Sequence, residues 1–145
     1  MSTLRAGLLA VLAVTIPLTL AVASAARDDT PPELLEAKNP VDELSEKRVA
    51  YFKKQFKAKC ARCHGEHGDG GGAEAQQQDV PPADLTDAEV MGERTDGQLF
   101  HQILVGGLPR CAMPAFGPRS DHGWPEQKVW EMVAYVRLLS EKPSE

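Results

Sequence analysis

Cys60-Ala61-Arg62-Cys63-His64 is the most specific chemical pattern in this chain, with two thiols separated by two residues and an imidazole directly after the second thiol. A thioredoxin-like redox pair requires a strand–helix–strand setting, and a zinc site requires a second pair of ligands. Neither accompanies the motif, because the only other cysteine is Cys111 and the flanking sequence has helical periodicity. The Cys-x-x-Cys-His pattern therefore indicates an attachment site for c-type haem.

The spacing of the motif explains its chemistry. Each thiol adds to one vinyl group of the porphyrin, and two intervening residues allow both sulfurs to reach one edge of the ring. The histidine that follows can then bind the iron from the proximal side. We therefore predict that Cys60 and Cys63 hold one haem c covalently and that His64 is the proximal iron ligand. Cys111 is then left without a partner for an internal disulfide.

The N-terminal part of the chain differs from the remainder in composition. Residues 1–25 contain Arg5 followed by an uncharged apolar run that ends in small residues, which predicts a signal peptide or, alternatively, an uncleaved N-terminal membrane anchor. Residues 26–39 are polar and contain Pro31-Pro32, so we expect a flexible linker. Residues 40–141 then form a single domain, located in the periplasm or elsewhere outside the cytoplasm, with membrane contact only if the leader is uncleaved.

The periodicity of apolar residues predicts an all-α fold without strands or internal repeats. Asn39 is expected to cap a first helix that has Pro40 in its first turn, runs to about Ala58 and leads into Cys60. Later helix starts are expected at Thr86-Asp87-Ala88-Glu89, Thr95-Asp96-Gly97-Gln98 and Pro125. The glycine-rich residues 65–72 are expected to form a loop that approaches a porphyrin closely.

The candidates for a second axial iron ligand are three methionines and three histidines, namely Met91, Met113, Met132, His67, His101 and His122. Met113 is preferred, because Pro114 stiffens its loop and the small residues Ala115 and Gly117 allow close approach to a haem ring. A thioether ligand stabilises Fe(II) relative to a second imidazole and raises the reduction potential. His122, in the same long loop, is the best imidazole alternative.

Charge is unevenly distributed along the chain. Residues 47–62 contain seven basic side chains and no acidic one, whereas the stretch that follows is acidic. The basic stretch fits a solvated helix face that complements the helix dipole, and it fits equally well a docking patch for redox protein partners. The net charge of −5 argues against nucleic acid as a partner.

Four further segments, taken together and in order, resemble the class I cytochromes c, in particular the small bacterial monohaem domains. These segments are Pro81-Pro82-Ala83-Asp84-Leu85-Thr86, Asp96-Gly97-Gln98-Leu99-Phe100, Met113-Pro114-Ala115-Phe116 and Val133-Ala134-Tyr135-Val136-Arg137. The resemblance covers about residues 47–139. It implies a cytochrome c domain over residues 40–141, with three to five helices wrapped around one covalently attached haem.

The resemblance also implies roles for single residues. Met113 matches the distal ligand, and Pro81 or, as we assign it, Pro82 falls where a loop proline accepts a hydrogen bond from the proximal imidazole. Phe56 matches the aromatic residue that packs the first helix on the last. Phe52 departs from the pattern, because the family often has glycine there for a close helix crossing. Cys111 is also unusual, and the alternatives for it are a small, partly buried residue, an intermolecular disulfide, a redox-sensitive thiol or a competing iron ligand.

The function that this resemblance implies is transfer of single electrons between respiratory or dehydrogenase partners, without enzymatic activity. Two alternatives stay open at this point. A labile Met113 would leave an iron position for a haem enzyme or a gas sensor. An uncleaved leader would make the chain a membrane-tethered cytochrome subunit of a larger oxidoreductase complex.

Overall fold

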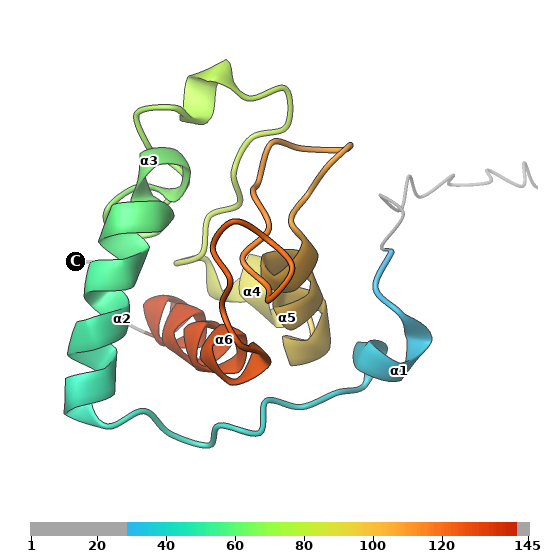
Figure 1. Ribbon diagram of the computed structural model, residues 1–145. Helices are drawn as coiled ribbons and strands as arrows, with labels where there is room; N and C mark the ends of the chain where they lie inside the picture. The colour runs from blue at the N-terminus through green and yellow to red at the C-terminus, as the bar shows by residue number, and fades with distance from the viewer. Residues whose placement is uncertain (1–28, 142–145) are drawn as a thin grey trace, which may run out of the picture.

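The computed structural model describes residues 29–141, which form six α-helices, one 3₁₀ helix and no β-strand (Figure 1). The elements are α1 (Pro32–Leu35), α2 (Glu46–Lys59), α3 (Ala61–His64), η1 (Ala75–Gln77), α4 (Ala88–Gly92), α5 (Asp96–Val105) and α6 (Glu126–Ser140). The all-α prediction is confirmed, and single-turn elements such as α1 and α3 raise the number of helices above the three to five expected. The predicted signal peptide lies outside the described residues.

Helices α2, α5 and α6 surround the core. The largest fully buried side chains of the described residues come from α2 and α6, and they are Phe52, Phe56, Val129, Met132 and Val133. The rings of Phe56 and Tyr135 lie 5.9 Å apart between centroids, so Phe56 packs the first long helix on the last as the resemblance implied. Phe52, in the place of the expected glycine, is 0 % exposed. The crossing between α2 and α6 is therefore repacked around an aromatic ring.

The start of the first long helix was predicted wrongly. Helix α2 begins at Glu46, where the Ser45 side chain accepts a hydrogen bond from the backbone N–H of Arg48. Asn39 instead fastens an extended segment to two other helices. Its backbone N–H donates to Asp96 Oδ2 at 3.1 Å, and its side-chain Nδ2 donates to the Trp130 carbonyl at 3.0 Å. The Asn39 Oδ1, which is the group that caps a helix, accepts the Val41 N–H at 2.9 Å, but no helix follows directly and α2 begins only at Glu46.

Residues 29–45, which we call the strap, contain α1 and cross one side of the molecule before they lead into α2 (Figure 1). The strap packs on the beginning of α5, where the Gly97 N–H donates to the Ala37 carbonyl at 3.2 Å. A Cβ atom on Gly97 would lie 1.6 Å from the Leu34 carbonyl oxygen, so only glycine fits at this contact. The part of the expected linker that the structure describes is therefore packed against the domain.

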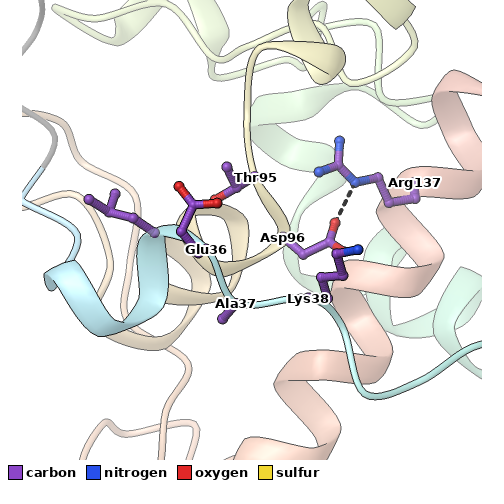
Figure 2. Close-up of a pocket in the computed structure, with 7 residues that line it drawn as sticks. Glu36, Ala37, Lys38, Thr95, Asp96 and Arg137 are labelled. Atoms are coloured by element: carbon purple, nitrogen blue, oxygen red, sulfur yellow. Dashed lines mark hydrogen bonds and ion pairs between the residues drawn. The ribbon is translucent and has the colours of Figure 1, made fainter.

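Arg137 of α6 joins the ends of two other helices. Its Nη1 donates to the Met91 carbonyl at 2.5 Å and its Nη2 to the Arg94 carbonyl at 2.6 Å, so it binds one carbonyl in the last turn of α4 and one just after that helix. Its Nε forms an ion pair with Asp96 Oδ1 at 2.8 Å. Figure 2 shows this pair beside Glu36, Lys38 and Thr95 in a polar pocket. No residue of the Cys-x-x-Cys-His motif lines that pocket.

The remaining helix starts follow the sequence closely. The capping box at Thr95 and Gln98 is present, with both reciprocal hydrogen bonds. The capping box expected at Thr86 is wrong, because Asp87 caps α4 by itself and Thr86 bonds to Asp84 instead. Helix α6 begins directly after Pro125 as predicted. None of the helices between residues 29 and 141 combines the length and the apolarity needed to span a membrane.

Candidate haem site

Helix α3 brings the two thiols and the imidazole of the motif together. Cys60 ends α2, with its N–H bonded to the Phe56 carbonyl at 2.8 Å, and it also precedes α3. The Cys60 carbonyl then accepts the N–H groups of Cys63 at 3.1 Å and His64 at 2.9 Å. In a helical turn, positions three and four residues apart share a face. Cys60, Cys63 and His64 are therefore held on one face of one short turn.

The His64 ring is fixed by a backbone carbonyl. Its Nδ1 lies 3.2 Å from the Ala83 oxygen, and a ring that donates through Nδ1 keeps the lone pair of Nε2 free for a metal. Burial lowers the pKa of His64, and the bond to Ala83 opposes this shift only in part. The neutral imidazole, which is the form that binds iron, is therefore favoured.

The acceptor of this bond differs from the prediction, which named Pro81 or Pro82. The Pro82 carbonyl is directed toward the glycine-rich loop, since a Cβ atom on Gly70 would lie 2.9 Å from it. The carbonyl of the next residue, Ala83, then lies at the His64 ring. The Leu85 N–H donates to the Gly68 carbonyl at 2.7 Å and attaches this segment to the loop.

The glycine-rich loop packs on the backbone of α3. The N–H groups of Gly70, Gly72 and Glu74 donate to the carbonyls of His64 at 2.9 Å, Cys63 at 3.1 Å and Arg62 at 2.8 Å. A Cβ atom on Gly72 would lie 2.4 Å from the Arg62 carbonyl oxygen. Gly70 and Gly72 thus pack on the protein itself, and the approach of this loop to a porphyrin stays a prediction. The loop satisfies the free carbonyls of α3 and so fixes the turn that carries His64.

The three thiols have different surroundings. Burial raises the pKa of the Cys60 thiol to about 12, so the thiol is protonated at neutral pH in this fold. Cys111 is half-buried, and a Cβ atom on Gly107 would lie 2.0 Å from its Sγ. That contact fits the interpretation of Cys111 as a small, partly buried packing residue.

Met113 lies in a loop that backbone hydrogen bonds attach to α5. The Gly107 N–H donates to the Met113 carbonyl at 2.9 Å, which closes a hairpin over residues 107–113. After the hairpin, the N–H groups of Phe116 and Gly117 donate to carbonyls near the end of α5 at 3.0 and 2.9 Å. Met113 is half-buried, and its Sδ accepts a hydrogen bond from Gln102 Nε2 at 3.6 Å. Figure 1 shows this loop and α3 toward the same end of the molecule.

The other ligand candidates occupy different settings. Met132 is 1 % exposed and Met91 is 2 % exposed, and both belong to the hydrophobic core. The His122 ring stacks on Phe116 with centroids 4.3 Å apart, His101 is half-buried on α5 and His67 is exposed. The donor set that fits haem c is therefore two thiols, an imidazole with a free Nε2 and the thioether of a tethered loop.

A helical domain with this donor set belongs to the class of c-type cytochromes. Residues 48–136 match the sequence model of the family described as cytochrome c oxidase, cbb3-type, subunit III. Because this range is more than half of the chain, the chain belongs to that family of cytochrome c domains. Haem c is the cofactor that such a domain implies.

One solved structure with a similar fold is a chain of the reducing HAO-like protein complex of Kuenenia stuttgartiensis, with a TM-score of 0.53 and 22% sequence identity. The match covers 71% of this chain and 49% of that chain, so this protein spans about half the length of its structural neighbour. The likeness concerns the fold. No curated protein matches the sequence.

Two contacts of the site were not foreseen. The Ala83 carbonyl is a backbone group that every residue has, so the residue type at position 83 could not indicate this contact. Gln102 could have been suspected only because a polar side chain follows His101 on a helix with an otherwise apolar second half. Both contacts depend on where a loop returns to a helix, which sequence spacing does not specify.

Proposed function

We propose that this chain is an exported monohaem cytochrome c that passes single electrons between redox proteins. Cys60 and Cys63 would hold the haem through two thioethers, with His64 and Met113 as axial ligands. The observation that carries the proposal is the bond between His64 Nδ1 and the Ala83 carbonyl at 3.2 Å, since it selects the tautomer that can bind iron. Support also comes from the single Cys-x-x-Cys-His motif in the chain.

Haem c, when bound, supplies one-electron chemistry at its iron. The role of the protein is then to hold two ligands in the same place in both oxidation states. The Ala83 carbonyl fixes the His64 ring, and the hairpin closed by Gly107 fixes Met113. Because His64 and Met113 would both bind the iron, they would leave no position on it for a substrate, so we favour outer-sphere electron transfer over catalysis.

The proposed partners are proteins with an acidic surface around their own redox centre. Lys47, Lys53, Lys54 and Lys57 are all exposed on α2, which leads directly into Cys60. Lys57 also forms an ion pair with Glu66 at 2.8 Å, so part of the basic charge is compensated within the chain. Such exposed charges increase association rates more than they increase affinity, which suits a carrier that must dissociate after each transfer.

The proposed location is the periplasm or another compartment outside the cytoplasm. Cytochrome c domains are typically extracytoplasmic, and residues 1–25 have the composition of a signal peptide. Sequencing the N-terminus of the mature protein tests this part of the proposal. A start near residue 26 is expected, and a start at residue 1 or 2 would contradict cleavage.

A second candidate is a cytochrome subunit of a larger oxidoreductase complex. The family description names an oxidase subunit, and the structural neighbour is a chain of a complex. Native purification distinguishes the two candidates. A haem-loaded species with the size of one chain supports the carrier, whereas stable co-purification with other subunits in the membrane fraction favours the second candidate.

Iron ligation is tested by absorption spectra of the oxidised and reduced haem-loaded protein, compared with Met113→Ala. We expect a low-spin c-type spectrum in the parent and a weak far-red methionine–iron band in its ferric form. That band should disappear in the variant, because alanine has no donor atom. His122→Ala serves as the control and should retain the band. A Met113→Ala spectrum identical to that of the parent would remove Met113 as the ligand.

A further inference from the structure

The side chain of Gln102 contacts the sulfur of the proposed iron ligand. Its Nε2 lies 3.6 Å from Met113 Sδ, within the range of an N–H···S hydrogen bond. Gln102 belongs to the last turn of α5, and its own carbonyl accepts the Gly106 N–H at 3.0 Å. The backbone that carries this amide is therefore held in regular helical geometry.

The neighbouring hairpin leaves room for the amide. A Cβ atom on Gly107 would lie 3.3 Å from Gln102 Nε2 and 2.0 Å from Cys111 Sγ. The absence of a side chain at Gly107 thus allows both the amide and the thiol to lie against the hairpin. A side chain at this position would displace one or both of these groups.

The loop does not need this side-chain bond to keep its shape. Backbone hydrogen bonds already close the hairpin at Gly107 and Met113, and they attach the following residues to α5 through the N–H groups of Phe116 and Gly117. The Gln102 bond is directed instead at the thioether sulfur of Met113, which is the proposed iron ligand. A thioether sulfur is a weak hydrogen-bond acceptor. The Gln102 N–H group that it binds could instead donate to water, which is a better acceptor.

A hydrogen bond to a ligating sulfur has a defined chemical effect. The N–H group withdraws electron density from the sulfur, which makes the thioether a weaker donor to iron. A weaker donor disfavours Fe(III) more than Fe(II), so the bond raises the reduction potential. It also fixes the orientation of the sulfur lone pairs, in the way that partners of ligating side chains commonly do.

We propose that Gln102 is a positioning residue of the haem site, which holds the Met113 thioether by a hydrogen bond from Nε2 to Sδ and raises the reduction potential of the iron. The inference rests on the proposed ligation by Met113. It goes further in assigning a residue that acts on the iron only through its ligand.

The test compares the haem-loaded parent with Gln102→Leu, which keeps the bulk of the side chain and removes the donor. Gln127→Leu is the matched control, because this substitution makes the same chemical change at an exposed position on α6. We measure the reduction potential, the far-red ferric band and the rate at which added imidazole displaces the methionine. In Gln102→Leu the potential should fall and displacement should become roughly two- to tenfold faster, the factor expected for one lost hydrogen bond.

The outcomes separate this inference from the ligation on which it depends. A lower potential and faster displacement in Gln102→Leu, but not in Gln127→Leu, support the role of Gln102. Values equal to those of the control overturn it while leaving Met113 as the ligand. An unchanged spectrum in Met113→Ala overturns the ligation and, with it, this inference.

Two further measurements guard against a variant that folds poorly. Gln102→Asn retains the amide but shortens the side chain by one methylene, so its potential should shift in the same direction as that of Gln102→Leu. In the reduced parent, the Gln102 amide protons should give a nuclear Overhauser effect to the Met113 methyl group. The absence of that effect in a well-resolved spectrum would contradict the contact.

Discussion

Asp84 directly follows Ala83, whose carbonyl binds the His64 ring. The Asp84 carboxylate accepts two hydrogen bonds from Thr86. The Thr86 hydroxyl donates to Asp84 Oδ1 at 2.6 Å and the Thr86 N–H donates to the same oxygen at 2.8 Å. Because both bonds favour the carboxylate, with the hydroxyl the larger cause, they hold the pKa of Asp84 below its ordinary value. This turn follows directly after Ala83, so its geometry bears on the proximal side of the site.

Thr86→Val is expected to raise the pKa of Asp84 toward its ordinary value, since the hydroxyl donor is lost. A carboxyl group with a lowered folded-state pKa contributes stability above its unfolded pKa of about 4, and this contribution is lost as the pH falls through the folded-state value. The parent should therefore be more stable than the variant at neutral pH, and the difference should vanish in acid. Carboxyl chemical shifts of the reduced protein across pH 2–6 measure the change; equal Asp84 midpoints would contradict it.

At the scale of single residues, the sequence can propose candidates where chemistry depends on residue type. Covalent attachment of haem needs thiols, and imidazole and thioether are common iron ligands, so Cys60, Cys63, His64 and Met113 could be proposed from type and spacing, and they stay predictions. The carbonyl of Ala83 could not be selected, because backbone groups are common to all residues. Asn39 was misassigned because its Oδ1 accepts the Val41 N–H as a helix cap would, although no helix begins there and its other polar groups bind α5 and α6.

At the scale of elements, the contact between the strap and α5 gives a direct test. Gly97→Ala would normally favour a helix, but its Cβ atom would lie 1.6 Å from the Leu34 carbonyl oxygen. We expect the free energy of unfolding to fall by about 1–3 kcal/mol, the usual cost of overpacking. Gly92→Ala is the matched control, because no atom lies within 4 Å of its added Cβ atom. It should be neutral or stabilising by up to about 1 kcal/mol.

Urea denaturation of the two glycine variants measures this difference. A Gly97→Ala protein that is as stable as Gly92→Ala would show that the strap moves away from α5 at little cost. The strap would then behave as the linker that the sequence suggested, because its contacts would contribute little to the stability of the domain.

The crossing of α2 and α6 gives a second test at this scale. Phe52 is 0 % exposed and lies where the resemblance suggested glycine. Phe52→Ala should lower the free energy of unfolding by about 3–5 kcal/mol, because it removes a buried ring and leaves a cavity. The neighbouring exposed change Lys53→Ala should alter it by less than about 0.5 kcal/mol. A loss below about 1 kcal/mol for Phe52→Ala would mean that the two helices close the gap, as they would around glycine.

Helix positions were predictable because their apolar periodicity and caps are local, as at Thr95 and Pro125. The strap was not predictable, since residues 29–45 have little periodicity and are ordered by partners about 60 to 90 positions away, for example Asp96 and Trp130. The packing of the glycine-rich loop on α3 is a third case. The glycines in the sequence indicate that another group lies close to the backbone of this loop. Only the fold identifies the backbone of α3 as one such group.

At the scale of the whole molecule, net charge and local charge predict opposite behaviour. The chain has a net charge of −5, so an anionic oxidant such as ferricyanide should be repelled, and salt should accelerate its reaction by screening that repulsion. The exposed lysines of α2 predict the reverse. Lys54 precedes Cys60 by about 9 Å along the helix axis, within the screening length of about 10 Å at 0.1 M salt.

We expect the local field to dominate, because an electron leaves through the part of the surface nearest the haem and not through the average surface. Oxidation of the reduced protein by ferricyanide should therefore slow as salt is added. Lys54→Glu should slow it at low salt more than Lys38→Glu, which makes the same charge change at an exposed position in the strap. If the rate rises with salt, or if the two variants respond equally, net charge governs the encounter. The basic face of α2 is then a solvated helix surface rather than a docking site, and the partner has to be sought at another face of the domain.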